Sequence, residues 1–250
     1  MFAPLAGLGP VAWLVMLAGL AVGALARGYS GFGFSALLVA SWSLVGAPAQ
    51  AVAVALVLEL TASVIQAASV WHDIPWRRVG LLLAGATVGT PFGTHLLAVA
   101  DVRTLRLGIA LFILLAAIAL LAGIKLRTRQ GTATVAGVGF ASGLCNGAVA
   151  MGGLPVAVFL TAEGNSPRAL RASVVAYFFL LDLVGLLFLA RERLVGVATF
   201  SLAACCLPVL MLGMWLGGRH FLGATPDGFR RVTLGLLVLL AVVGIVRALV

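Results

Sequence analysis

Long, uninterrupted apolar runs are the feature that most constrains how this chain can fold. An α-helix needs about 20 such residues to cross the hydrocarbon core of a bilayer. With 63% of its residues hydrophobic and 9% charged, the chain is far more apolar than a soluble domain. Its runs lack the two-residue alternation of a membrane β-barrel, so we predict an all-α polytopic membrane protein. The predicted complete spans are residues 49–70, 79–98, 105–124, 170–190, 195–217 and 231–249.

Two further apolar regions, residues 10–46 and 132–161, are interrupted by glycine-rich breaks at residues 28–33 and 146–153. Membranes tolerate non-helical backbone only where protein or a watery cavity shelters it. We therefore predict two broken helical hairpins that dip into the membrane and turn back. Several of their pieces are too short for a comfortable crossing. Such a break is a site by default.

The two halves of the chain are weakly similar in a constant order. The run RTLRLG at 103–108 matches RRVTLG at 230–235, and an Asp precedes each, Asp101 and Asp227. A hairpin plus three spans makes an odd number of crossings per half, so the halves would have opposite orientations. We predict an inverted repeat, a signature of transporters, with residues 1–125 as the first repeat, 126–131 as a basic cytoplasmic linker and 132–250 as the second repeat.

The basic residues lie almost entirely between apolar runs, so we read the net charge of +9 as a topology signal and expect no nucleic-acid partner. With both termini outside, ten basic residues face the cytoplasm and five face outward, leaving Arg27 at the first break. This partition predicts a multi-pass protein of the cell membrane, N-out and C-out. The cytoplasmic set is Arg77, Arg78, Lys125, Arg127, Arg129, Arg168, Arg171, Arg219, Arg230 and Arg231.

The run YSGFGFSALLV at residues 29–39 resembles the first-half hairpin motif of the TauE/SafE sulfite-exporter family, also called TSUP. The segments SGL at 142–144 and MGGLP at 151–155 resemble its second-half partner, and the resemblance extends over nearly the whole chain. One departure is Ala40, where the family often has proline, while Pro155 keeps it in the second half. The resemblance implies transport of small sulfur-containing anions such as sulfite, sulfoacetate or other organosulfonates, with export as the expected direction.

At a helix break, free backbone N–H groups and a partial positive charge suit a compact oxyanion. Glycines there would let the backbone approach the anion, although small residues also simply permit tight helix crossing. Arg27 would pair with a sulfite or sulfonate oxygen, or snorkel from a membrane face. Phe32 and Phe34 would gate the break or only pack, and Ser35 is a further donor. The predicted substrate-binding residues are Arg27, Ser30, Gly31, Phe32, Gly33, Phe34, Asn146, Gly147, Gly152 and Gly153.

Glu59 and Asp182 are the only acidic residues well inside predicted spans, and each lies in the helix directly after a hairpin. A carboxylate in a membrane usually pairs, takes up a proton or faces water, and functional use is the default interpretation. Proton coupling is one hypothesis. Structural pairing with an arginine, Gln66, Tyr177 or a backbone donor is the other. The predicted coupling or gating residues are thus Glu59, Gln66, Tyr177 and Asp182.

Other function classes explain less of the sequence. The tetrapeptide GYSG at 28–31 resembles the nucleophile motif of rhomboid proteases, but His72, His95 and His220 fall near span ends, where no base is expected for Ser30. An anion channel stays open, although a passive pore gains little from carboxylates in its path. We therefore expect a non-enzymatic transporter without cofactor or metal, whose partners are a small anion and the lipid bilayer. Coupling to protons and assembly into a homo-oligomer stay open.

Overall fold

The computed structural model of the chain describes residues 9–31, 33–67, 71–121, 130–164, 166–220, 238 and 242. These residues form helices and connecting segments without a strand, which confirms the all-α prediction. Linker residues 126–129 lie outside the described residues, as does the predicted span 231–249 apart from residues 238 and 242. The helices are α1 (Pro10–Ser30), α2 (Phe34–Val45), α3 (Pro48–Ala67), a 3-10 turn η1 (Trp71–Asp73), α4 (Trp76–Val99), α5 (Val102–Leu121), α6 (Thr132–Val149), α7 (Gly153–Ala162), α8 (Pro167–Arg191) and α9 (Val197–His220).

Six described helices, namely α1, α3, α4, α6, α8 and α9, are long and apolar enough to cross a membrane. The chain is therefore a polytopic membrane protein. The hairpin pieces that are too short to cross are the second arms of the two hairpins. The first arms α1 and α6 have 21 and 18 residues, whereas α2 and α7 have 12 and 10. At 1.5 Å per residue, the short arms reach about 15 to 18 Å, well below the roughly 30 Å of a hydrocarbon core.

Both breaks are shorter than predicted, because several glycines continue their helices. Helix α1 runs through Gly28 to Ser30, and α6 runs through Asn146 and Gly147 to Val149. Each of these glycines serves a helix crossing. A Cβ atom on Gly28 would lie 2.2 Å from the carbonyl oxygen of Met214 in α9, and one on Gly147 would lie 2.5 Å from that of Thr90 in α4.

Helices α4 and α6 cross along two facing stripes of glycine. A Cβ atom on Gly143 would lie 2.1 Å from the Ala86 carbonyl oxygen, so no side chain fits between the backbones. Close crossing through residues spaced four apart is a recognised mode of helix association in membranes. The stripes consist of Gly85, Gly89 and Gly93 on α4 and of Gly139, Gly143 and Gly147 on α6.

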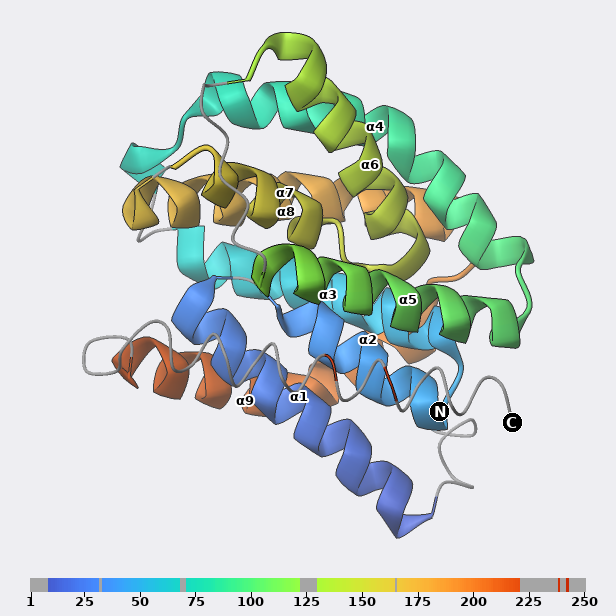
Figure 1. The fold of residues 1–250 in the computed structure, drawn as a ribbon. Helices are drawn as coiled ribbons and strands as arrows, with labels where there is room; N and C mark the ends of the chain where they lie inside the picture. The colour runs from blue at the N-terminus through green and yellow to red at the C-terminus, as the bar shows by residue number, and fades with distance from the viewer. Residues whose placement is uncertain are drawn as a thin grey trace.

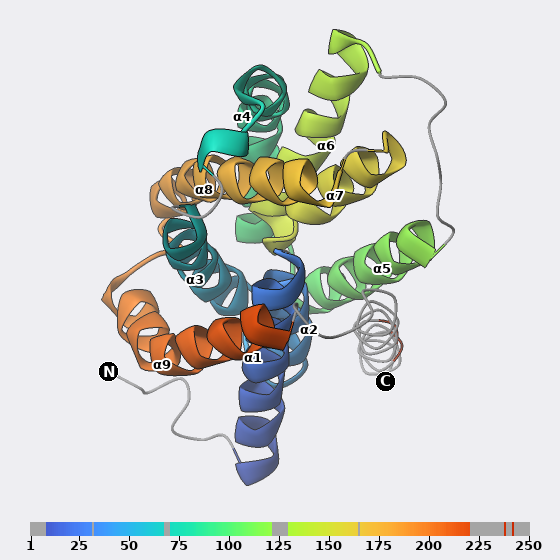
Figure 2. The ribbon, with the colours of Figure 1, turned by 90° about the vertical axis from the view of Figure 1, so that its left-hand side faces the viewer.

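The α4–α6 pair and the α1–α9 pair lie on opposite sides of the molecule, with α3 and α8 between them (Figures 1 and 2). Helix α3 packs against α8 and α9, and α8 packs against α3 and α4. The α1–α9 crossing is also close, since a Cβ atom on Gly217 would lie 2.3 Å from the Leu25 carbonyl oxygen. This arrangement places both breaks beside the central helices α3 and α8.

Candidate substrate site at the two helix breaks

The first break is built around Arg27, in the last turn of α1. Its side chain is completely buried, with an exposed fraction of 0%, so the alternative in which it snorkels from a membrane face is wrong. Nη1 lies 3.0 Å from Oε2 of Glu59 and donates to the Gly31 carbonyl oxygen at 2.7 Å. Nη2 donates to Oγ of Ser63 at 2.7 Å. The guanidinium therefore ties the end of α1 to α3.

Two glycines give the first break its shape. Gly31 and Gly33 have φ angles of 81° and 92°, in the left-handed region that side chains with a Cβ rarely adopt. The Gly31 N–H closes α1 by donating to the Arg27 carbonyl oxygen at 2.9 Å, and Gly33 precedes the first residue of α2. The chain thus turns abruptly and points the N-terminus of α2 towards Glu59.

Glu59 connects that helix N-terminus to Arg27. Its Oε1 accepts a hydrogen bond of 3.2 Å from the Ser35 backbone N–H, in the first turn of α2. Its Oε2 faces the Arg27 guanidinium, and the side chain is 3% exposed. A backbone N–H at a helix N-terminus and a guanidinium are both donors that suit an oxyanion. For Glu59, the structure thus shows the predicted pairing with an arginine and a backbone donor.

Further residues complete the first break, and sequence reasoning missed three of them. Gln66, which we had predicted, donates from Nε2 to the Arg27 carbonyl oxygen at 3.3 Å. Ser63 was missed, although it lies one helical turn after Glu59 on the same face. The Phe178 ring centroid lies 4.7 Å from Cζ of Arg27, close enough for a cation–π interaction.

Arg171 is the third missed residue, because we assigned it to the cytoplasmic topology signal. It lies in the first turns of α8, and its Cγ is 3.5 Å from where a Cβ on Gly31 would be. It is close enough to Arg27 for the two charges to repel. No local sequence pattern indicates this approach, since it depends on how α8 packs across the first hairpin.

The second break has no arginine and is organised by the Asn146 amide. Its Nδ2 donates to Oδ1 of Asp182 at 3.2 Å, while its Oδ1 accepts from the Gly152 backbone N–H at 3.3 Å. Tyr177 donates to Oγ of Ser142 at 2.7 Å, and Ser142 in turn donates to the Gly152 carbonyl oxygen. Here too a buried carboxylate is linked to the short arm's N-terminus, but through a neutral amide.

The remaining predicted site residues make close packing contacts or lie outside the described residues. A Cβ on Gly153 would lie 1.7 Å from the Phe178 ring, and one on Gly152 would lie 2.6 Å from the Ser142 carbonyl oxygen. Phe34 is completely buried and packs against Gly23 of α1. The side chain of Ser30 and all of Phe32 lie outside the described residues.

The two breaks are joined through α8, which carries Phe178 against the first and Asp182 against the second. The Asp182 and Glu59 carboxylates are close enough to repel each other. Oδ2 of Asp182 is buried without a hydrogen-bond partner among the described residues. Because Arg27, Glu59 and Asp182 are each at most 3% exposed, both breaks are closed to solvent in this conformation.

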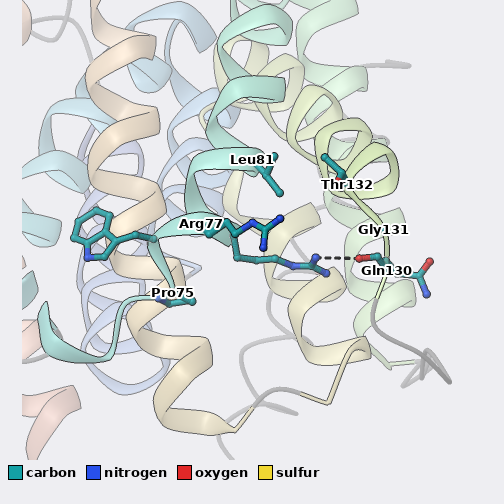
Figure 3. Close-up of a pocket in the computed structure, with 8 residues that line it drawn as sticks. Pro75, Arg77, Leu81, Gln130, Gly131 and Thr132 are labelled. Atoms are coloured by element: carbon teal, nitrogen blue, oxygen red, sulfur yellow. Dashed lines mark hydrogen bonds between the residues drawn. The ribbon is translucent and has the colours of Figure 1, made fainter.

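A pocket of about 550 Å³ lies elsewhere, between the N-terminal ends of α4 and α6 (Figure 3). Arg78 lines the pocket and donates to the Gln130 carbonyl oxygen at 3.0 Å, and it also pairs with Glu163. None of the lining residues belongs to either break. Those residues are Pro75, Trp76, Arg77, Arg78, Leu81, Gln130, Gly131 and Thr132.

Comparison with known families decides the assignment, because residues 15–244 match the family model described as sulfite exporter TauE/SafE. The chain belongs to the TauE/SafE sulfite exporter family. Neither curated proteins nor solved structures give a match. Membership of TauE/SafE confirms the resemblance seen at the hairpin motifs, and it favours membrane transport of anions over intramembrane proteolysis.

Proposed function

We propose that this TauE/SafE protein is a secondary transporter that carries small sulfur-containing anions, such as sulfite, sulfoacetate or other organosulfonates, with export as the direction. The observation that carries the proposal is the fully buried Arg27 at a glycine-rich helix break. A buried cation in a membrane protein is costly and marks a functional site by default. Here it sits beside backbone that can approach a compact oxyanion.

The first break fits an anion better than the second does. Arg27 and Arg171 approach each other at the first break, whereas Asp182 lies at the second. A small sulfur anion would therefore bind against Arg27, Gly31 and Gly33. The second break, with Asn146, Gly152 and Gly153, would close the site from the other side.

We further propose that the halves 1–125 and 132–250 form an inverted repeat that alternates access to this site. Corresponding helices of the two halves make corresponding contacts, which supports the proposal. The long hairpin arm α1 packs on α9, just as α6 packs on α4, and the first post-hairpin helices α3 and α8 pack on each other. Both termini would lie on the outer, non-cytoplasmic side of the cell membrane.

A carrier fits the described conformation better than an open pore does. Arg27, Glu59 and Asp182 are all closed off from solvent, as a carrier requires in its occluded state. A coupled carrier also needs groups that exchange protons, and the two carboxylates in the central helices are such groups. We therefore propose coupling to protons through Glu59 and Asp182.

The test is uptake of labelled sulfite and sulfoacetate into proteoliposomes, with and without an imposed pH gradient and against empty liposomes. We expect saturable uptake that responds to the gradient. If neither anion is taken up under any gradient, the proposed substrate class is wrong. Uptake that is linear in concentration and indifferent to the gradient would instead favour a channel.

A further inference from the structure

We infer that the Glu59 carboxylate occupies the place of the substrate's oxyanion, so that an arriving anion must displace it. The inference rests on the proposed function and names the subsite within the first break. It consists of the Ser35 backbone N–H and the Arg27 guanidinium. The ligand class is a sulfonate, sulfite or similar group that presents two oxygens to these donors.

The geometry of Glu59 is that of a bound anion. Oε1 accepts a hydrogen bond of 3.2 Å from the Ser35 backbone N–H, and Oε2 lies 3.0 Å from Nη1 of Arg27. One carboxylate thus bridges a backbone donor of α2 and a guanidinium of α1. Two of the three oxygens of a sulfonate have a comparable arrangement. The carboxylate is, in effect, an anion tethered to α3.

The two anions exclude each other because both are negatively charged in a closed break. Arg27 donates further hydrogen bonds to Ser63 and Gly31, and its Nε has no partner among the described residues. Holding two negative charges in this closed break would add repulsion to the cost of desolvation. Binding of the substrate therefore requires Glu59 to leave as a neutral, protonated acid, and one proton is taken up with each anion.

Few other charged groups face Glu59 and could influence the competition between its carboxylate and the substrate anion. Helix α1 contributes Arg27, and α8 contributes Asp182, with Arg171 beside the same break. Helix α2 contributes a backbone N–H rather than a charge. Helix α6 has no Asp, Glu, Lys or Arg, the only such residue of α9 is Arg219 near its end, and those of α5 are Arg103 and Arg106 near its start. Asp182 is thus the rival proton acceptor.

The experiment measures binding of methanesulfonate to the purified protein by calorimetry, because this anion stays ionised throughout pH 5.5–7.5 by its own chemistry. Two buffers of different ionisation enthalpy report the protons taken up. The wild-type protein should bind more weakly as the pH rises and take up a proton. Glu59→Gln should bind about tenfold more tightly or better, because the charged competitor is gone, with no proton uptake and a flat pH profile.

The matched control is Glu163→Gln, which removes one partner of the buried Arg78–Glu163 ion pair outside both breaks. It should lose stability, as any broken buried pair does, but keep the wild-type affinity and proton uptake. Asp182→Asn should keep the proton uptake that accompanies anion binding, because in this inference Glu59 is the group that takes up that proton. If Glu59→Gln is unstable, its melting temperature should rise with methanesulfonate more than that of the wild-type protein. Glu59→Asp, which withdraws the carboxylate by one methylene, should bind with intermediate affinity.

The outcomes separate the two ideas. If the wild-type protein transports sulfite but Glu59→Gln keeps wild-type affinity and proton uptake, the displacement is wrong and the proposed function stands. The same holds if Asp182→Asn abolishes the proton uptake. A wild-type protein that neither binds nor transports any of these anions would overturn both.

Discussion

The Arg27 guanidinium and the Glu59 carboxylate lie 3.0 Å apart, with exposed side-chain fractions of 0% and 3%. This pair joins the end of the first long hairpin arm to the central helix α3. Removal of one partner from a buried ion pair leaves an uncompensated charge, whereas replacement of both by apolar residues is often neutral or stabilising. The pair is therefore a site where stability and function can be separated.

A double-mutant cycle should show that separation. We expect Arg27→Met and Glu59→Met each to cost about 3–5 kcal/mol of stability, because each leaves a buried charge. The double variant should recover most of this loss. Thermal unfolding in detergent measures all three, and additive losses in the double variant would contradict a tight pair.

The α4–α6 crossing should tolerate no side chain at its centre. Gly143→Ala should cost about 1–3 kcal/mol, since its Cβ would meet the Ala86 backbone. Gly137, on the same helix, has nothing within 4 Å of its would-be Cβ, so Gly137→Ala should be neutral or stabilise by up to about 1 kcal/mol. Equal melting temperatures for the two variants would refute the close crossing.

The contribution of Asp101 to the stability of the start of α5 should depend on pH. Hydrogen bonds from the Thr104 side chain and backbone N–H, at 2.7 and 2.9 Å, lower the pKa of the Asp101 carboxyl below its ordinary value of 3.8. A lowered folded-state pKa gives stability that is present above the unfolded value and is lost as the pH falls through the folded one. The melting-temperature gap between wild type and Asp101→Ala should therefore shrink as the pH falls below the ordinary value of 3.8. A gap that does not change with pH would argue against the bonds.

The proposed orientation can be read from the two ends of α4. Arg77 and Asp101 are both exposed and lie at opposite ends of that helix. In a background without Cys145, Cys205 and Cys206, a membrane-impermeant thiol reagent should label Asp101→Cys in intact cells. Arg77→Cys should react only after permeabilisation. The reverse pattern would show that the termini face the cytoplasm.

The sequence predicts the elements of this fold well because lipid imposes strict lengths and satisfied backbones. The structural role of a glycine is ambiguous in the sequence, since glycine occurs both where a helix breaks and where two helices cross closely. Gly31 and Gly33 break the first hairpin, but Gly28 and Gly147 stay helical because α9 and α4 approach them. Which role a glycine has depends on a partner helix that local sequence does not reveal.

The candidate site shows the same limit. Arg27 and Glu59 stand out in sequence because charge is rare in apolar runs, and the structure brings them together. Arg171 does not stand out, because an arginine near the end of a span is also a common topology signal. Ser63 is an ordinary polar residue whose importance comes only from the group it meets, Arg27.

The most direct test of the proposed function is labelled sulfite uptake by proteoliposomes that contain the Arg27→Met, Glu59→Met double variant, beside wild type and Glu163→Gln. Because the double variant should fold, a loss of uptake cannot be attributed to unfolding. The account predicts saturable uptake by wild type and Glu163→Gln and none above empty liposomes by the double variant. Uptake by the double variant at the wild-type rate would contradict an anion path through the first break.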